Sequence, residues 1–175
     1  MITTDPQDEV FPLVDERDVV IGSVTRKEAN SNPRIIHRAI EVLIYNTLGE
    51  LLIQKRSSTK DVMPNTWTLS VGGHVNYGDS YDSSAIREIE EEIGVIVEKS
   101  RLKLLGKILV RLPWENEYLQ VYEYRMLEDT ELHINIEEIS EVKFVSIQTL
   151  YAMLEDATIE WSIFARETLK QFPLR

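Results

Sequence analysis

The stretch that decides the fold is residues 73–95, which read GHVNYGDSYDSSAIREIEEEIGV. Its second part predicts a helix over Ser80–Ile93, because Asp79 or Ser80 can cap the amino end and Gly94 suits the left-handed position after the last turn. At about 100° per residue, four apolar side chains share one face of this helix: Ala85, Ile86, Ile89 and Ile93. We therefore expect that face to pack against a hydrophobic core.

An acidic stripe lies next to the apolar one, with carboxylates at Glu88, Glu90, Glu91 and Glu92. The nearby base, Arg87, is placed to pair with Glu91 four residues on, which leaves the other carboxylates uncompensated. Crowded carboxylates repel one another, and a hard divalent cation removes that cost by taking their oxygens as ligands. A cation site is one interpretation of this stripe, and a solvated acidic surface is the alternative.

Together with its flanks, this segment closely resembles the Nudix box. That pattern is Gly, five residues, Glu, seven residues, then Arg-Glu-apolar-any-Glu-Glu-any-Gly-apolar, and six identical positions and two apolar positions match within residues 73–95. One position departs from it, because Asp79 stands where the family has glutamate. The resemblance implies an α/β fold, an α/β/α sandwich with a mixed sheet, and hydrolysis of a diphosphate linked to another group.

The resemblance also implies roles for particular residues. Glu88, Glu91 and Glu92 resemble the ligands of Mg²⁺, with Mn²⁺ as an alternative metal, and the backbone carbonyl of Gly72 adds a further oxygen. Arg87 resembles the residue that orients the glutamates, and Glu88 or another glutamate of the box resembles the base. Magnesium chemistry agrees with these roles, because Mg²⁺ prefers a few carboxylates plus phosphate oxygens and activates bound water.

The rest of the chain predicts an uneven mixture of strands and helices, which favours a layered mixed fold over strict βαβ winding. An amino-terminal extension, residues 1–30, is expected to hold a hairpin of Val10–Val14 and Val19–Val24. Further strands are expected at Arg34–Tyr45, Glu50–Lys55, Trp67–Val71, Leu102–Leu112, Tyr118–Met126 and Val142–Val145, and helices at Thr149–Leu154 and Ile159–Gln171. Because no linker or repeat interrupts residues 1–175, we expect one domain.

A narrower resemblance extends from about Leu13 to the last helix. The segments that carry it look like the isopentenyl-diphosphate isomerase branch of the superfamily: Asp15–Gly22, His37–Ala39, Gln54–Lys60, Trp67–Val71 and Glu115–Glu117. In that isomerase three histidines and two glutamates hold a further metal, and a cysteine with a glutamate moves the proton.

This chain keeps only part of that constellation. Four ligand positions are filled, by His37, His74, Glu115 and Glu117, whereas Asn30 stands where the remaining histidine would be. Gly72 stands where the cysteine would be, and the chain contains no cysteine. The isomerase mechanism is therefore disfavoured, and the intact glutamate box favours hydrolysis.

The same resemblance places substrate contacts outside the box. Arg56 and Lys60 are expected to bind the diphosphate, since an arginine fork and a lysine point charge both suit phosphate oxygens. His74 is expected to line the site, and Glu117 is a candidate base or extra metal ligand from a distal loop. The alternatives are ordinary surface bases, loop charges and, for His37, a hydrogen-bonded structural histidine.

Composition narrows the classes of function. The absence of cysteine excludes disulfides, thiolate metal sites and a thiol nucleophile within this chain. The 30 acids against 19 bases give a net charge of -11, which disfavours polymeric nucleic acid and anionic membrane as partners. No stretch approaches the ~18–20 apolar residues of a membrane span, and no signal peptide is visible, so we expect a cytoplasmic protein.

These observations lead to one hypothesis and two rivals. The first is a Mg²⁺-dependent Nudix hydrolase that attacks the diphosphate bond of a small phosphorylated metabolite, in particular a nucleotide derivative. The rivals are an isomerase acting on isopentenyl diphosphate and a non-catalytic sensor that binds a nucleotide or diphosphate. A homodimer is compatible with the family resemblance, and no feature of the sequence requires it.

Overall fold

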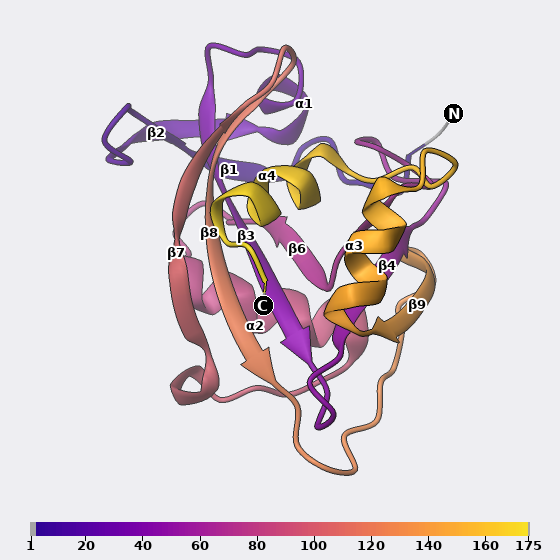
Figure 1. The fold of residues 1–175 in the computed structure, drawn as a ribbon. Coiled ribbons are helices and arrows are strands. Elements are labelled where there is room, and N and C mark those ends of the chain that lie inside the picture. Colours follow the sequence, from indigo (N-terminus) through magenta and orange to yellow (C-terminus); the bar gives the residue numbers. More distant parts are fainter. Residues whose placement is uncertain (1–2, 175) are drawn as a thin grey trace.

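The computed structural model describes residues 3–174, and its central strand is β3 (Ile36–Tyr45). Along one edge, β3 pairs in parallel with β8 (Asn116–Arg125) over its whole length, and β8 pairs antiparallel with β7 (Lys103–Arg111). Along its other edge, β3 pairs antiparallel with three strands in succession: β1 (Val10–Val14), β6 (Val71–His74) and β4 (Leu51–Arg56). The sheet is therefore mixed, as expected (Figure 1).

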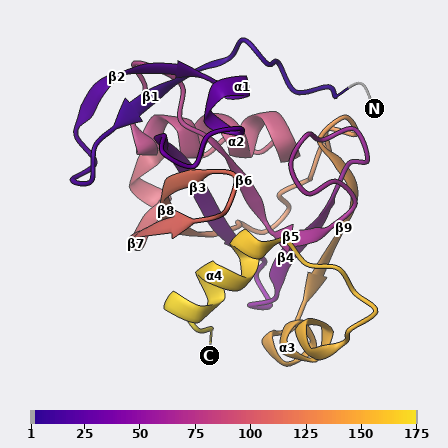
Figure 2. The ribbon, with the colours of Figure 1, turned by 90° about the horizontal axis from the view of Figure 1, so that it is seen from above.

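A second group of strands forms around β4, which pairs antiparallel with both β5 (Trp67–Leu69) and β9 (Ile139–Val145). Helix α2 (Tyr81–Ile93) covers one face of the sheet, while α3 (Ile147–Glu155) and α4 (Ile163–Gln171) lie on the other (Figure 2). This arrangement confirms the α/β/α sandwich. A single 3₁₀ turn, η1 (Lys99–Arg101), precedes β7.

Helix α2 forms as its sequence predicts. The Ser80 side chain accepts a hydrogen bond from the backbone N–H of Ser83, and Gly94 ends the helix with a φ of 69°. Three members of the apolar stripe are fully buried, namely Ala85, Ile89 and Ile93, and they pack in one core with Ile40, Val42 and Ile44 of β3. That packing holds the acidic stripe of α2 beside β6.

The opposite face of β3 contributes to a second core beneath α3 and α4. Ala39 and Leu43 lie in this core because side chains alternate between the faces of a strand. Glu41, at 3% exposure, falls on the same face between them and interrupts the apolar row. A charged residue is therefore buried in the middle of the central strand.

The amino-terminal hairpin is confirmed as β1 paired antiparallel with β2 (Val20–Thr25). A short helix, α1 (Arg26–Ala29), follows it and was not predicted from the sequence. It is held by a capping box, in which Thr25 and Glu28 satisfy each other's backbone N–H groups. Only one turn long, α1 presents no apolar periodicity that a sequence pattern could reveal.

Several boundaries differ from prediction by one to four residues, and two of the differences have a clear structural cause. The expected strand Trp67–Val71 divides at Ser70, because β5 pairs with β4 whereas β6 pairs with β3. The last helix begins at Ile163 rather than Ile159, because Ser162 caps it by accepting from the N–H of Ala165. Trp161 therefore precedes the helix, buried as expected, and forms a parallel bridge with Trp67. Within residues 3–174, no helix is both long and apolar enough to cross a bilayer.

Candidate active site

A pocket lies between the amino-terminal segment, β6 and α2, and we call it the outer pocket. Its walls include eight of the residues expected from the sequence: Arg56, Lys60, Gly72, His74, Arg87, Glu88, Glu91 and Glu92. The walls also include residues that no motif marked, namely Asp5, Glu9, Arg26, Asn135 and Glu138. The ninth expected residue, Glu117, lies outside these walls, in an adjoining cavity described below.

Glu88 is packed directly against the backbone of β6. A Cβ atom added to Gly73 would lie 2.2 Å from the Glu88 carboxyl carbon, so this close approach requires glycine. The Glu88 carboxylate also pairs with Arg87 at 2.8 Å. Burial raises the pKa of Glu88 to about 7, because desolvation outweighs the attraction of Arg87. The fold thus presses one carboxylate of the box against the Gly72–Gly73 backbone.

Glu92 is more deeply buried, at 4% exposure. Its Oε2 accepts a hydrogen bond from Gln54 Nε2 at 2.8 Å. Burial raises the pKa of Glu92 well above its usual value, and the negative charge of Glu88 adds to the effect. No ion pair to Glu92 forms within the described part of the chain. A buried carboxylate without an ion pair is destabilised, and a bound cation would remove that cost.

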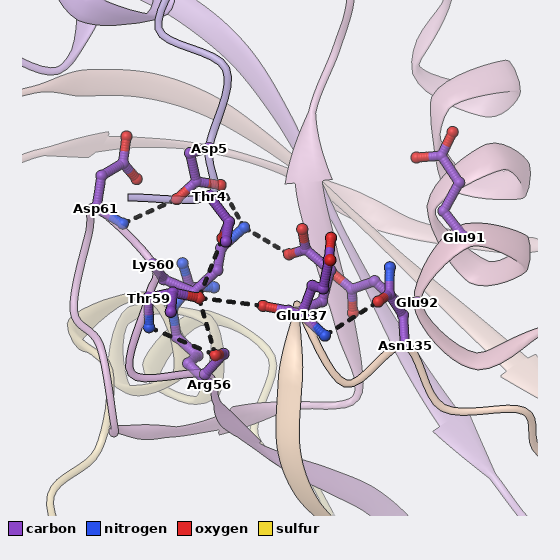
Figure 3. Close-up of polar contacts among 12 residues, drawn as sticks. Thr4, Asp5, Arg56, Thr59, Lys60, Asp61, Glu91, Glu92, Asn135 and Glu137 are labelled. Carbon is purple, nitrogen blue, oxygen red and sulfur yellow. Dashed lines mark hydrogen bonds and ion pairs between the residues drawn. The ribbon is translucent and has the colours of Figure 1, made fainter. Parts of the chain in front are cut away.

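Arg87 joins the helix to the loop before it. One guanidinium nitrogen pairs with Glu91 at 2.7 Å, as the spacing predicted, and another donates to the His74 carbonyl at 3.0 Å. The Glu91 side chain is 55% exposed and stands apart from Glu92 (Figure 3). The three carboxylates of the box therefore reach the same pocket without converging on one point.

The donor set suits a hard divalent cation. The carboxyl of Glu88, paired with Arg87, and the buried carboxyl of Glu92 line one pocket with Gly72 and Gly73, and all of these groups offer oxygen. The outer pocket therefore offers oxygen ligands for a cation beside α2.

Lys60, expected to contact substrate phosphate, is already engaged. Its ammonium group pairs with Asp5 and with Glu138, the latter at 2.5 Å, and the residue is only 9% exposed (Figure 3). Asp5 also pairs with Arg26 at 3.0 Å and accepts from the N–H of Asp61 at 2.8 Å. The amino-terminal segment is thereby fastened across one side of the outer pocket.

Arg56 keeps a position that suits the expected role. Its Nε donates to the Val62 carbonyl at 3.1 Å, and the residue lines both the outer pocket and the adjoining cavity. Burial raises the pKa of Glu92, Glu115 and Glu117, and the positive charge of Arg56 opposes this rise in all three. Arg56 therefore acts on acids of both cavities.

The adjoining cavity, which we call the inner chamber, lies on the other side of the Gly72–Gly73 backbone. Its empty volume is about 600 Å³, a figure that includes open solvent at its mouth. Its walls include Ala39, Glu41, Thr68, Glu115, Glu117, Leu119, Ser162 and Phe164. Both cavities share Arg26, Arg56, Gly72, Gly73 and His74, so they adjoin each other.

A group of three ligand-type side chains stands beside the inner chamber. His37, His74 and Glu117 each offer one atom, and these atoms all lie within 4.8 Å of one another. Within residues 3–174, neither ring nitrogen of His37 is recorded with a hydrogen-bond partner, which gives no support to the alternative of a hydrogen-bonded structural histidine. Burial lowers the pKa of His37 to about 4 and that of His74 well below its usual value, which keeps both rings neutral.

Glu115 and Asn30 occupy two further positions of the isomerase-like ligand set. Glu115 Oε2 lies 4.0 Å from His37 Nε2, whereas Asn30 points to Asp61, with Nδ2 at 3.4 Å from its carboxylate. Burial raises the pKa of Glu115 to about 7 and the pKa of Glu117 well above its usual value; for Glu117, the charges of Glu115 and Glu41 add to the effect. Neutral imidazoles beside carboxylates are a plausible metal environment on chemical grounds.

Sequence reasoning missed Glu41 and the acids that hold Lys60. Glu41 did carry a signal, because a single charged residue interrupts the apolar run Ile40–Tyr45. Asp5 and Glu138 carried none, because nothing in their local sequence indicates that a lysine far along the chain would pair with them.

Comparisons with known proteins agree with this geometry. Residues 35–167 match the NUDIX domain family. An uncharacterized Nudix hydrolase of Pseudomonas aeruginosa is 35% identical over 137 residues, which span 78% of each chain. Isopentenyl-diphosphate Delta-isomerase 2 of Photorhabdus laumondii is 30% identical over 164 residues, covering 93% of this chain and 91% of that protein.

A solved structure also resembles this fold closely. DR0079 from Deinococcus radiodurans superposes with a TM-score of 0.76 at 27% identity, covering 93% of this chain and 98% of that one. The domain match and the relatives cover the strands and the helix that build both cavities. The protein therefore belongs to the Nudix family, and it is a hydrolase of diphosphate bonds in small molecules.

Proposed function

We propose that the protein is a Mg²⁺-dependent hydrolase that cleaves the diphosphate linkage of a nucleotide derivative in the cytoplasm, with Mn²⁺ as an alternative metal. The observation that carries this proposal is the pair of carboxyls Glu88 and Glu92: Glu88, with its side chain 12% exposed, packs against the Gly73 backbone, and Glu92 is buried at 4% exposure. Their negative charge is only partly compensated by Arg87. A cation that also binds phosphate oxygens would supply the missing positive charge.

Each residue of the outer pocket has a proposed part in hydrolysis. Glu88, Glu92 and the Gly72 carbonyl hold the cation, and Glu91 completes the set from the rim. When bound, Mg²⁺ neutralises phosphate oxygens and lowers the pKa of a bound water. Glu88 accepts the proton of the attacking water, and Glu117 is the alternative acceptor.

The bases and His74 position the substrate. Arg87 keeps Glu88 and Glu91 oriented through its ion pairs and fixes α2 to β6 through the His74 carbonyl. Arg56 offers a planar fork to the phosphate oxygens. Lys60 adds positive charge beside them, although it must share its ammonium group with Asp5 and Glu138.

A panel of nucleoside di- and triphosphates, dinucleotides, nucleotide sugars and prenyl diphosphates, assayed with Mg²⁺ and Mn²⁺, tests the proposal. We expect Glu88→Gln and Glu92→Gln to lower kcat by roughly 10²–10⁴-fold on any substrate found. Glu90→Gln is the matched control, because Glu90 is exposed on the same helix and does not line the outer pocket. Full metal-dependent turnover in either site variant would show that these roles are wrong.

Isomerisation of isopentenyl diphosphate is the second candidate, and the group His37, His74 and Glu117 is the observation that favours it. Against it, Gly72 occupies the position of the expected cysteine, and no cysteine exists in the chain to replace it. Incubation with isopentenyl diphosphate in deuterated water decides between them, since an isomerase would incorporate deuterium into the substrate carbons. We expect none.

The remaining parts of the proposal concern partners. A small-molecule diphosphate is the proposed substrate, without polymeric nucleic acid or membrane as partners, and a homodimer is compatible with the family. Sedimentation velocity measures the oligomeric state directly. A non-catalytic sensor would bind members of the substrate panel tightly and turn over none of them.

A further inference from the structure

Glu41 is a buried carboxyl that the proposed hydrolysis does not use. Its side chain leaves the middle of β3 toward the inner chamber, which it lines, and the residue is 3% exposed. Within residues 3–174, its Oε2 has no hydrogen-bond partner. An unpaired buried polar group carries an uncompensated desolvation cost, which is larger if the group is charged. A group kept at that cost on a cavity wall indicates a ligand that completes it.

The surroundings of Glu41 offer no cation dedicated to it. Two bases line the inner chamber, Arg26 and Arg56, and Arg26 is already paired with Asp5, Glu9 and Asp61. Burial raises the pKa of Glu41 to about 7, and a side-chain hydrogen bond with Thr168 of α4 opposes this rise. Thr168 is thus a neutral partner that faces Glu41, while Glu41 Oε2 still lacks a partner of its own within residues 3–174.

The remaining walls limit what can occupy the inner chamber. Ala39, Leu119 and Phe164 supply apolar surface, while Thr68 and Ser162 satisfy each other through a hydroxyl pair 2.8 Å apart. In the inner chamber a phosphate group would meet the acids Glu41, Glu115 and Glu117, whereas in the outer pocket the proposed cation would attract it, so the phosphates are placed in the outer pocket. The inner chamber is therefore left for the organic part of the substrate.

A hydrocarbon group suits this chamber poorly. An isoprenoid chain would cover Glu41 without giving its carboxyl a donor, so the desolvation cost would remain. A flat heterocycle can instead pack on Phe164 and Leu119 and present N–H groups to the carboxyl. A carboxylate accepts two parallel N–H donors especially well, as it does from an arginine fork.

We propose that Glu41 determines substrate specificity by accepting hydrogen bonds from a heterocycle edge with two adjacent N–H donors, as guanine and pterin rings provide. This proposal rests on the proposed function for the placement of the phosphates in the outer pocket. It names the organic group that the inner chamber recognises, which the glutamate box does not determine.

Measurements of binding affinity test the role of Glu41 independently of hydrolysis. Titration calorimetry with Ca²⁺ in place of Mg²⁺ measures the Kd of four probes: guanosine triphosphate, dihydroneopterin triphosphate, inosine triphosphate and isopentenyl diphosphate. Inosine lacks only the 2-amino donor of guanosine. We expect both probes with two donors to bind at least about 10-fold more tightly than inosine triphosphate, because a hydrogen bond to a charged group contributes about 1.5–3 kcal/mol. We expect isopentenyl diphosphate to bind most weakly.

Two variants show whether Glu41 causes the difference. Glu41→Gln keeps the shape but replaces one acceptor oxygen with a donor, so guanosine and inosine triphosphates should bind within about twofold of each other. Glu41→Leu should in addition strengthen isopentenyl diphosphate binding relative to the nucleotides. Glu155→Gln, an exposed site on α3, is the control and should keep the wild-type order. Melting curves confirm that each variant is folded.

The outcomes distinguish the two proposals. Equal affinity of the wild type for guanosine and inosine triphosphates, no detectable binding of either, or unchanged discrimination in Glu41→Gln would each overturn the role of Glu41. Selective binding without metal-dependent turnover would overturn the proposed hydrolysis of these compounds and leave the role of Glu41 standing. If guanosine triphosphate binds selectively and dihydroneopterin triphosphate does not, the ring that Glu41 recognises belongs to a nucleotide and not to a pterin.

Discussion

The outer pocket and the inner chamber both bury acids, but they acquire them in different ways. Glu88 and Glu92 come from one helix, four residues apart, and Arg87 pairs with the first of them. Glu41 and Glu117 come from β3 and β8, whose parallel register also sets His37 directly opposite Glu117. One set of acids is therefore specified by helix periodicity and the other by strand pairing.

The two cavities also differ in how their charge is balanced. Arg26 and Arg56 line both cavities, whereas Arg87 and Lys60 line only the outer pocket of the two. Beside the inner chamber, the histidines His37 and His74 are held neutral by burial. The outer pocket thus suits a cation with phosphate, whereas the inner chamber suits neutral donors or metal. The Gly72–Gly73 backbone between them is where the two can be separated by mutation.

Gly73→Ala should have the largest effect and should act through Glu88 of the outer pocket, although Gly73 itself lines both cavities. The new Cβ would lie 2.2 Å from the Glu88 carboxyl carbon, so Glu88 must move, and because it is the end of a flexible side chain the fold should survive. We expect kcat to fall by about 10²–10³-fold, as for loss of a positioned acid or base. Steady-state kinetics measure the loss.

Gly22→Ala is the control for this change, since its Cβ meets Leu13 at an ordinary contact distance of 3.7 Å. The ratio of the Kd values for guanosine and inosine triphosphates should stay unchanged in Gly73→Ala, even if each affinity falls because Glu88 has moved. Wild-type turnover in that variant, with a normal melting temperature, would show that the position of Glu88 does not matter.

The pH dependence of stability should separate the cavities at intermediate size. The folded-state pKa of Glu88 is raised to about 7 from an unfolded value near 4.5. The folded metal-free protein therefore holds this proton more tightly than the unfolded chain. The stabilisation is fully present below the unfolded pKa and is lost as pH rises through the folded pKa, by up to about 3 kcal/mol.

Denaturant melts between about pH 5 and pH 8 measure this loss. Glu88→Gln should show a smaller loss than the wild type, and added Mg²⁺ should restore wild-type stability above the folded pKa but have less effect on Glu88→Gln. A pH profile that is identical in the two proteins would contradict the assignment. Glu41→Gln serves as the comparison for the inner chamber, and Mg²⁺ should stabilise it as much as the wild type.

Asp5→Asn should have the smallest effect and should test how the amino-terminal segment bears on the outer pocket. Removing the charge weakens pairs to Arg26 and Lys60, but Arg26 keeps Glu9 and Asp61 and Lys60 keeps Glu138. We expect a stability loss of about 1–2 kcal/mol, below the ~3–5 kcal/mol for a fully broken buried pair. Melting curves measure it, and KM should change more than kcat, because Lys60 lies beside the proposed phosphate site.

Asp8→Asn is the matched control, because Asp8 is exposed in the same segment. Discrimination between guanosine and inosine triphosphates should remain at the wild-type level in both variants. A loss of that discrimination in Asp5→Asn would mean that the amino-terminal segment shapes the inner chamber as well.

Much of the fold could be predicted because its signals are local. The ends of α2 follow from Ser80 and Gly94, and the hairpin β1–β2 from two β-branched runs around a polar turn. The split at Ser70 could not be predicted, because it arises from two different partner strands, β4 and β3. Helix α1 was missed because one capped turn leaves too short a pattern.

The sequence by itself determined the family resemblance, the acidic face of α2 and the pairing of Arg87 with Glu91, since all depend on neighbours within one or two helical turns. Tertiary structure alone decided that Glu92 is buried, that Lys60 is held by Asp5 and Glu138, and that Glu41 lines a chamber without a partner. Those features depend on contacts between residues far apart in the chain, which strand register and layer packing create and which no local spacing encodes.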